Sequence, residues 1–333
     1  MVLVDSLYVN SSGGLLLLQY LVSELNRRGL PFHLLADQRC KGLFDGDEVT
    51  YLIAKHSLRR DYYLRHQHNY SAILCFGNIP PLIKLDVPVY TYFHNINLLT
   101  LRDIYFFKWK ISAFFKRIYF FLYKKNTTYW IVQTTNTRDE LITHLHEPIE
   151  KVIILPFFDI PLSIKEKSNA THGDDYAYIG SYTGSKGHDE LLKAWEILHQ
   201  NGMDFTLHLT VREGAPIFPA KIKLAQQEGL KIINHGQIPF EAVGDLYGKA
   251  KAIIYPSKNE SLGLGIVEAI SAGCDVIGSD LPFIHSVCQP SCTFNPRDPQ
   301  SIADAVVRYE KGICPKSTLS ISNGIDELID LLF

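Results

Sequence analysis

Short apolar runs alternate along this chain with longer segments in which the apolar residues recur at helical spacing. The runs are rich in β-branched and aromatic residues, and loops with Gly, Pro, Asn or Asp separate them, a pattern typical of parallel α/β sheets. In the first half we expect one helix over residues 15–28, closed by Gly29. The strands predicted there span residues 2–7, 31–36, 72–76, 88–92, 129–133 and 152–155.

A polar stretch over residues 163–175 interrupts this pattern and is the best candidate for a linker. The alternation then starts again, so we expect two domains, 1–162 and 176–333, each a Rossmann-like doubly wound α/β sheet. Strands are predicted over 176–179, 205–211, 231–234, 252–255 and 275–278, with helices over 187–200, 240–249, 264–272 and 299–312. Ligands bind beyond the carboxyl ends of the strands in such sheets, and two sheets that face each other enclose a cleft.

The composition supports a folded protein of two domains. One hydrophobic core seldom serves more than about 250–300 residues, and this chain has 333. With 46% hydrophobic and 20% charged residues, it has the composition of a globule rather than of a disordered chain. The formal net charge of -2 gives no reason to expect nucleic acid as a partner, so a charged partner requires a local cluster.

The cysteines and the start of the chain bear on its compartment. We expect free or buried thiols, as is typical of a reducing cytoplasm, because no C-x-x-C pattern occurs. Cys288 and Cys292 resemble half of a metal site, but no second pair at ligand spacing completes it. No basic region precedes the first apolar run, and no run of about 18 uncharged apolar residues occurs. We therefore expect a cytoplasmic protein. The six cysteines are Cys40, Cys75, Cys274, Cys288, Cys292 and Cys314.

The segment YPSKNESLGLGIVEA, residues 255–269, carries the most chemistry. A strand ends at Tyr255, a polar loop presents Glu260, and a helix opens with Ser261, Leu262, Gly263 and Leu264. The free N–H groups of such a first turn bind anions, and glycines let a phosphate approach the backbone. Glu268 lies further into the helix, where it reaches a polar group such as a ribose diol. An N-capped amphipathic helix with one acid near its positive end explains the same spacing equally well.

The order of motifs around this segment resembles that of the family 4 glycosyltransferases, and Glu260 and Glu268 match their E-x7-E signature. The resemblance covers residues 178–306 strongly and the preceding part more weakly. It implies a GT-B fold, a retaining reaction and a nucleotide-sugar donor. The matching motifs are Asp245-Leu246-Tyr247, Ala252-Ile253-Ile254-Tyr255-Pro256-Ser257, Glu268-Ala269, Ala272-Gly273, Val276-Ile277-Gly278-Ser279-Asp280 and Asn295-Pro296-Arg297-Asp298.

The resemblance also implies roles for single residues. Glu260 faces the donor sugar and the reacting centre, while Glu268 holds the ribose. Lys186, in the loop of residues 179–187, neutralises the donor diphosphate, a reasonable clamp for charge that develops on the leaving nucleotide. The family places an Arg where this chain has Ser181. Either Lys186 and the helix start suffice, or Arg212 substitutes; a solvated surface Arg is an equally good interpretation of Arg212.

The first half offers weaker candidates. Gly13 and Gly14 lie between a predicted strand and helix, where family members place a glycine-rich turn near the donor phosphates and acceptor. His94 follows a predicted strand, in a region where the family often has a His that approaches the donor sugar; a structural His is the alternative. The residues Phe76-Gly77-Asn78 also end a strand and are candidates for the acceptor side.

The motifs of nucleophilic and metal-dependent hydrolases are missing, as is a P-loop. A retaining GT-B enzyme needs none of them, because leaving-group departure and acceptor attack are thought to occur on one face of the sugar. We expect catalysis by positioning and by electrostatic stabilisation of an oxocarbenium-like state, without metal or cofactor.

A basic and aromatic segment over residues 101–125 bears on the acceptor. All its cations except Lys108 fall within about half of a helix circumference, opposite aromatic residues. Such a segment suits the surface of an anionic membrane and a lipid-linked acceptor. A helix with a buried aromatic face and solvated cations is the alternative. The cations are Arg102, Lys108, Lys110, Lys116, Arg117, Lys124 and Lys125.

These observations predict a retaining transferase that moves a hexosyl-type sugar from a nucleotide donor to a glycan acceptor. The resemblance favours a lipid-linked acceptor and a role in bacterial surface polysaccharide synthesis. The alternatives are another GT-B enzyme, such as a sugar-nucleotide epimerase, and a non-catalytic sugar-nucleotide binding module, which only Ser181 suggests.

Overall fold

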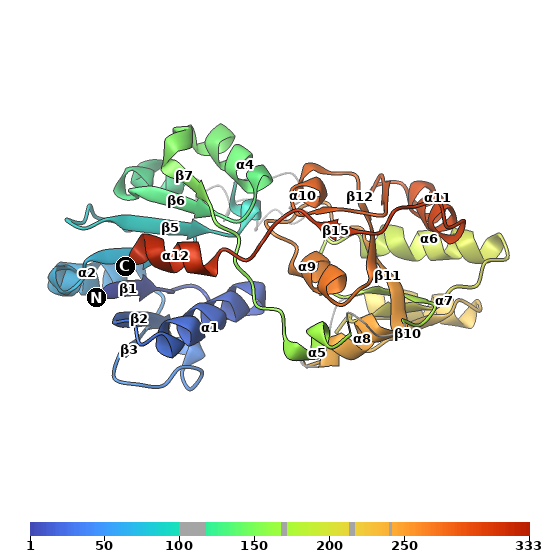
Figure 1. Cartoon of the computed structure of the whole chain (residues 1–333), viewed down its shortest axis with the longest axis horizontal. Helices are drawn as coiled ribbons and strands as arrows, with labels where there is room; N and C mark the ends of the chain where they lie inside the picture. Colours follow the sequence, from blue (N-terminus) through green and yellow to red (C-terminus); the bar gives the residue numbers. More distant parts are fainter. Residues whose placement is uncertain (100–117, 168–171, 213–216, 240–241) are drawn as a thin grey trace. The chain divides into compact units, whose positions relative to one another are not determined.

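The computed structural model describes residues 1–99, 118–167, 172–212, 217–239 and 242–333. The chain divides into two compact units (Figure 1). Unit 1 comprises Met1–Asp159 and Ser322–Phe333, and unit 2 comprises Ile160–Ile321.

Unit 1 is built on a seven-stranded sheet in the order β3-β2-β1-β4-β5-β6-β7, and every neighbouring pair is parallel. Its strands are β1 (Val2–Asp5), β2 (Phe32–Asp37), β3 (Val49–Leu52), β4 (Ala72–Cys75), β5 (Val89–Phe93), β6 (Tyr129–Val132) and β7 (Val152–Ile154). Its principal helices are α1 (Ser12–Arg27), α2 (His56–His66), α4 (Thr135–Leu145) and α12 (Ile325–Leu332). The central strands β1, β4 and β5 are wholly buried, as expected of a parallel sheet covered on both faces.

Unit 2 contains a six-stranded parallel sheet in the order β10-β9-β8-β11-β12-β14. Its strands are β8 (Asp175–Tyr178), β9 (Leu207–Leu209), β10 (Ile232–Asn234), β11 (Ala250–Tyr255), β12 (Asp275–Ser279) and β14 (Cys292–Phe294). A small antiparallel pair joins β13 (Cys288–Gln289) to β15 (Thr318–Leu319). The helices are α5 (Leu162–Lys165), α6 (His188–Gln200), α7 (Phe218–Gln227), α8 (Val243–Lys249), α9 (Leu264–Ser271), α10 (Pro282–His285) and α11 (Pro299–Glu310).

The two Rossmann-like sheets confirm the predicted fold class. Several elements were not predicted. The edge strand β3, the outer strand β14 and helices α2, α4, α7 and α12 were not expected. The first helix begins at Ser12 instead of residue 15, so that Gly13 and Gly14 belong to its first turn rather than to a preceding loop. Gly29 follows the helix with φ of 63°, as expected of a glycine that closes a helix.

The expected boundary at residues 163–175 differs from the observed division, because the end of the chain returns to unit 1. Helix α12 contacts β4 and lies beside the unit 1 sheet (Figure 1). Asn323 anchors this return: its Oδ1 accepts a hydrogen bond from the Phe158 amide at 3.3 Å, and its Nδ2 donates to the Tyr20 hydroxyl at 2.8 Å. The segment 322–333 therefore belongs with the first sheet, and not with the predicted domain 176–333.

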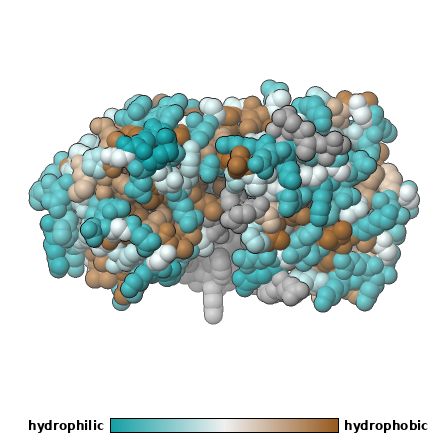
Figure 2. Space-filling model, turned by 60° about the horizontal axis from the view of Figure 1, so that its bottom comes forward, coloured by the Kyte–Doolittle hydropathy of each residue, from teal (hydrophilic) through white to brown (hydrophobic). Residues whose placement is uncertain are grey.

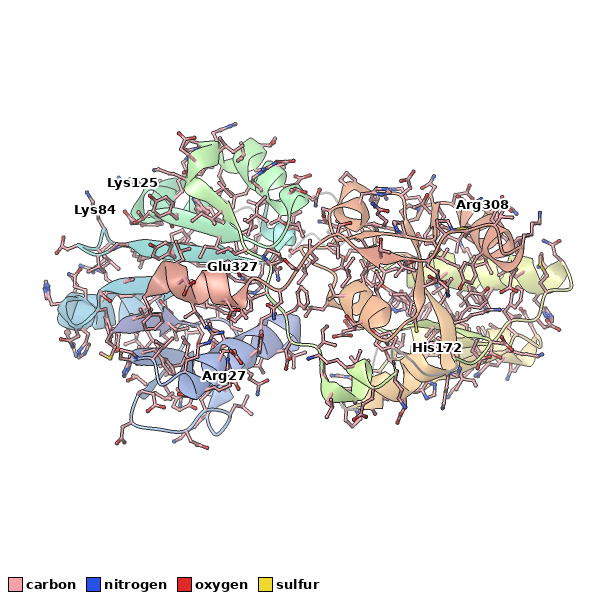
Figure 3. The ribbon with its side chains drawn as sticks, viewed as in Figure 1. Arg27, Lys84, Lys125, His172, Arg308 and Glu327 are labelled. Atoms are coloured by element: carbon pink, nitrogen blue, oxygen red, sulfur yellow. A yellow bond between two sulfur atoms is a disulfide. The ribbon has the colours of Figure 1, made fainter. Side chains whose placement is uncertain are left out.

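The surface carries the polar residues that the composition predicts. The face in Figure 2 is mostly covered by hydrophilic side chains, with hydrophobic ones between them. Arg27, Lys84 and Arg308 are among the exposed charges (Figure 3). No helix in the described part of the chain is long and apolar enough to cross a membrane.

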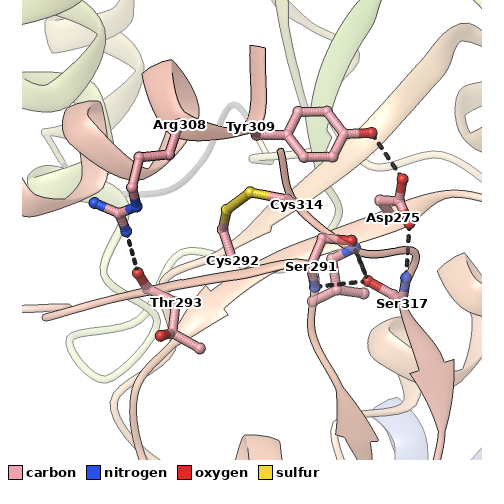
Figure 4. Close-up of a disulfide and its surroundings, with 9 residues drawn as sticks. Asp275, Ser291, Cys292, Thr293, Arg308, Tyr309, Cys314 and Ser317 are labelled. Carbon is pink, nitrogen blue, oxygen red and sulfur yellow. Dashed lines mark hydrogen bonds between the residues drawn. A yellow bond between two sulfur atoms is a disulfide. The ribbon is translucent and has the colours of Figure 1, made fainter. Parts of the chain in front are cut away.

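The cysteines depart from the expectation of free thiols at one place. Cys292 of β14 and Cys314 form a disulfide, which ties the segment before β15 to the outer strand of the unit 2 sheet (Figure 4). The same segment is held by Asp275, which accepts a hydrogen bond from the Ser317 amide at 2.8 Å. Cys40, Cys75, Cys274 and Cys288 are free and buried. Sequence reasoning missed the pair because Cys314 lies in a loop whose path only the fold reveals.

Candidate functional site

The strand order of unit 2 creates a switch point between β8 and β11. From β8 the chain builds β9 and β10 on one side, and it then returns to place β11 on the other side. In open parallel sheets, ligands bind outside the carboxyl ends of the strands at such a point. The loop of residues 179–187 leaves β8, and the loop of residues 256–263 leaves β11. These two loops are the segments that the sequence had singled out, and we call them the β8 loop and the β11 loop.

The two loops are held together through their backbones. The Lys258 amide donates a hydrogen bond to the Ser185 carbonyl at 2.7 Å. Gly187 has φ of 68°, and a Cβ at this position would lie 2.2 Å from the carbonyl oxygen of Pro256. Only glycine therefore permits this approach, since it has no side chain and adopts the left-handed region freely. The Tyr178 hydroxyl donates to the Lys186 carbonyl at 2.9 Å and fixes the β8 loop from beneath.

The paired loops bring Lys186 and Glu260 into direct contact. Lys186 Nζ lies 2.5 Å from Glu260 Oε1. The same oxygen accepts a hydrogen bond from Ser257 Oγ at 2.6 Å, and the Tyr255 hydroxyl lies 3.4 Å away. The two charged side chains are 25% and 15% exposed, so that the ion pair is partly buried but open to solvent.

The charge of Lys186 is secured by its partner. Burial opposes the charged form, but the nearby Glu260 carboxylate outweighs it and raises the pKa of Lys186 above its usual value. The ammonium group is therefore positive at neutral pH, as binding of a phosphate requires.

The β11 loop passes into α9 at Gly263, which has φ of 74°. A Cβ on Gly263 would lie 2.9 Å from Ile266 Cδ1, so a side chain there would crowd the first turn. Leu262 is 3% exposed and packs into the core, while Ser261 is partly exposed. Leu264 is the first residue of α9. Helix α9 thus begins at Leu264, after the residues Ser261, Leu262 and Gly263 with which the sequence pattern opens it, and anion binding at this helix start stays a prediction.

Glu268 lies on the buried side of α9 and is 7% exposed. Its Oε2 accepts a hydrogen bond from the Tyr247 hydroxyl at 3.0 Å. Burial raises the pKa of Glu268 to about 6, and the hydrogen bond from Tyr247 opposes this shift. The carboxylate is therefore ionised at neutral pH, yet it is short of partners that stabilise its charge.

Two further predicted residues of unit 2 stand apart from this cluster. Arg212 follows β9 and is exposed, and it forms no ion pair with another residue of the described ranges. Ser181, where the family has an Arg, is exposed on the β8 loop. Lys186 is consequently the cation that the structure brings to Glu260.

Unit 1 has its own switch point, between β1 and β4, and it gathers the remaining candidates. His94 Nε2 accepts a hydrogen bond from Asn78 Nδ2 at 3.2 Å, and the His94 amide donates to Asn78 Oδ1 at 2.7 Å. A Cβ on Gly14 would lie 3.0 Å from His94 Nε2, so the helix start packs directly on the imidazole. Burial lowers the pKa of His94 to about 4, which keeps the ring neutral at physiological pH. Gly13 precedes Gly14 in the same turn.

Sequence reasoning assigned no role to several residues that build the site. Ser257 and Tyr247 touch the two glutamates, and Tyr178 supports the β8 loop. Lys258 is 4% exposed at its side chain and donates to Glu190 at 2.8 Å, which adds an ion pair between the β11 loop and α6. Ser257 and Lys258 lie inside the segment quoted above, but their partners are distant in sequence, so no spacing signal identifies these roles.

Residues 173–311 match the family model described as glycosyl transferases group 1. These residues include both loops of the site, together with Lys186, Glu260 and Glu268. The matched residues all lie in unit 2.

The curated proteins to which parts of this chain are similar include bacterial mannosyltransferases. The chain is 28% identical over 149 residues to "Serotype-specific mannosyltransferase WbdA" of Escherichia coli, which covers 43% of this chain and 18% of that protein. It is 34% identical over 76 residues to "O-antigen chain mannosyltransferase RfbU" of Salmonella typhimurium, covering 22% of each. The chain thus spans about a fifth of the length of these relatives.

The fold of the whole chain also has solved counterparts. The structure of HepE from Anabaena in complex with UDP-glucose superposes with a TM-score of 0.67 at 16% identity. The match covers 94% of this chain and 90% of HepE. This likeness agrees with the GT-B fold, two Rossmann-like units in one chain, that the motifs predicted.

The close approach of the two loops makes a prediction about Gly187. We expect Gly187→Ala to lower the free energy of unfolding of unit 2 by about 3 kcal/mol, because the new Cβ both overpacks Pro256 and disfavours the positive φ. Gly202 is the matched control: it has φ of 76° but nothing within 4 Å of its Cβ position. Gly202→Ala should cost only about 1 kcal/mol. Hydrogen exchange of the β8 and β11 amides measures both losses, and equal losses would contradict the steric argument.

Proposed function

We propose that this chain is a retaining glycosyltransferase that moves a hexosyl-type sugar from a nucleotide-sugar donor to a glycan acceptor. The observation that carries the proposal is the Lys186–Glu260 pair at the switch point of the unit 2 sheet, within the residues that match the family model. In a nucleotide sugar, the sugar is bonded to an anionic diphosphate, which departs with the nucleoside when the sugar is transferred. A cation is suited to the diphosphate, and a carboxylate beside it is suited to the positive charge that develops on the sugar.

The roles divide along the β8 and β11 loops. Lys186 and the start of α9, at Ser261, Leu262, Gly263 and Leu264, hold the diphosphate. Glu260 faces the donor sugar and the positive charge that develops on it. Glu268, deeper on α9, accepts hydrogen bonds from the ribose. Arg212, exposed after β9, supplies a second cation for the nucleotide.

We assign the residues around His94 to the sugar-binding part of unit 1. Its neutral imidazole and the Asn78 amide suit hydroxyl groups of a sugar, since both hydrogen-bond without bringing charge. Gly14 leaves room for the His94 ring, because a Cβ there would lie close to the imidazole. Gly13 precedes Gly14 in the first turn of α1 and also has no side chain. Lys186 supplies positive charge at the diphosphate, so the proposed reaction requires no metal and no cofactor.

The acceptor that the relatives favour is a growing surface polysaccharide. WbdA and RfbU are named as mannosyltransferases, the latter of the O-antigen chain, and HepE was solved with UDP-glucose. We propose that the acceptor is a glycan carried on a lipid and that the reaction takes place on the cytoplasmic face of the membrane.

Peripheral contact with an anionic membrane is part of this proposal. Residues 100–117, most of the basic segment 101–125, lie outside the described residues. At its described end, Ile118, Phe121 and Leu122 are exposed, and Lys125 is exposed beside them. Exposed apolar side chains next to a cation are suited to the interface of an anionic bilayer.

A donor panel tests the proposed function. The purified protein is incubated with UDP-, GDP- and ADP-sugars, with and without lipid extract from a bacterium that makes surface polysaccharide. We expect transfer into the extract with one donor class, and a loss of about 100-fold or more in Glu260→Gln, which keeps shape but removes the charge. Conversion of the donor without acceptor would instead indicate an epimerase. Binding without turnover would indicate a binding module.

The buried carboxylate of Glu268 predicts a pH dependence of donor affinity. Because burial raises its pKa from 4.5 to about 6, the group is protonated, and a poorer acceptor for the ribose, below this pH. Donor affinity should fall about tenfold between neutral pH and one unit below the pKa. Titrations use intact UDP- or GDP-sugars, whose diphosphate does not titrate in this range. Glu268→Gln should bind more weakly with a flat profile; the same slope in this variant would exclude Glu268 as the titrating group.

The membrane contact is tested by co-sedimentation with vesicles containing phosphatidylglycerol. We expect Leu122→Ser combined with Lys125→Glu to reduce binding at least about fivefold, because it removes apolar area and replaces attraction with repulsion. Leu162→Ser in unit 2 is the control, since Leu162 is 70% exposed but has no basic segment beside it. Equal binding of the double variant and the wild type would refute the contact.

A further inference from the structure

The Lys186–Glu260 ion pair uses the groups that would bind a diphosphate. Lys186 Nζ is 2.5 Å from Glu260 Oε1, and Ser257 Oγ donates to the same oxygen at 2.6 Å. An ammonium group and a hydroxyl that converge on one anionic oxygen are also the groups that bind a phosphate oxygen. Glu260 thus lies where an anionic ligand of Lys186 and Ser257 would lie.

We propose that the Glu260 carboxylate stands in for the donor diphosphate, and that donor binding exchanges the Lys186–Glu260 ion pair for one between Lys186 and the diphosphate. This inference rests on the proposed function and adds a step to it. The carboxylate is freed for the sugar only when a diphosphate takes over its cation. The site thereby couples binding of the nucleotide to preparation of the group that faces the reacting carbon.

The backbone around Lys186 permits this exchange without a movement of the loops. The Lys186 carbonyl is held by Tyr178, and the next residue, Gly187, packs on Pro256. The backbone is therefore fixed, while the flexible side chain is 25% exposed and can turn toward solvent. Electrostatic repulsion drives the separation, since a carboxylate and a diphosphate that share one ammonium repel each other at short range.

Glu260 keeps a partner when Lys186 leaves it. Ser257 is fully buried, and its carbonyl accepts a hydrogen bond from Ser279 Oγ at 2.7 Å. Its hydroxyl is thus firmly positioned, and it continues to donate to Glu260 Oε1. The carboxylate is consequently held in place by a neutral group after the exchange, with its charge no longer compensated by the lysine.

A second ion pair, between the β11 loop and α6, provides a contrast. Lys258 also pairs with a glutamate, Glu190, at 2.8 Å, but its side chain is 4% exposed. A lysine this buried is not available to a ligand, so the pair fastens the β11 loop to α6. Removal of the Glu190 charge is therefore a matched control for removal of the Glu260 charge.

The test is the affinity for UDP, GDP and ADP, measured by calorimetry without divalent cations in a double-mutant cycle. In Glu260→Gln, Lys186 is free before the ligand arrives, and we expect about fivefold tighter binding of the preferred nucleotide. Lys186→Met should bind at least about tenfold more weakly. In the double variant, Glu260→Gln should bring no gain over Lys186→Met, because no cation remains to be released. Glu190→Gln should bind no more tightly than the wild type.

The outcomes separate the exchange from the proposed function. Unchanged or weaker binding by Glu260→Gln would overturn the exchange while the donor site stands. The same gain in the Lys186→Met background, or in Glu190→Gln, would overturn it as well, because general relief of negative charge would then explain the effect. If the wild type binds none of the three nucleotides, the proposed function itself is wrong, and the exchange is refuted with it.

Discussion

The approach of Gly187 to the Pro256 carbonyl is the constraint on which the site depends. It holds the β8 loop against the β11 loop at the switch point of the unit 2 sheet. Lys186 directly precedes Gly187, and Glu260 follows Pro256 in the β11 loop. The two charged side chains meet because this backbone contact holds their loops together. The hydrogen bond from Lys258 to Ser185 and the ion pair of Lys258 with Glu190 reinforce the same junction.

The carboxylates of Glu260 and Glu268 are close in sequence but have different partners and different burial. Glu260 has an ammonium group and a buried hydroxyl as partners and remains open to solvent. Glu268 is turned into the unit, where burial raises its pKa to about 6 and one tyrosine hydroxyl compensates part of the cost. Different environments for similar groups are the usual physical means by which an enzyme gives them different roles. The separate assignments to sugar and ribose are consistent with this difference.

The elements that the sequence predicted are those with the clearest apolar pattern. The buried strands β1, β4 and β11 were found because parallel strands covered on both faces are continuous apolar runs. The edge strand β3 is only half-buried, and α2 is rich in Arg and His, so neither has a hydrophobic period. The return of α12 to unit 1 and the Cys292–Cys314 pair depend on contacts between distant residues. For the same reason, Lys186 and Glu260 were predicted singly, whereas the role of Ser257 was not.

The two switch points have one topology but different electrostatics. In unit 1, Arg59 is 2% exposed and is engaged by Asp5 at 2.5 Å and by the carbonyls of Ile79 and Pro80. The Arg59 guanidinium therefore fixes the loop after β4 through these hydrogen bonds and is not available to a phosphate. In unit 2, hydrogen bonds from the Ser279 hydroxyl fix the corresponding loop after β11, which leaves Lys186 near the surface. A neutral His94 in one unit and an accessible Lys186 in the other favour a division in which unit 2 binds the anionic part of the donor and unit 1 binds uncharged sugar.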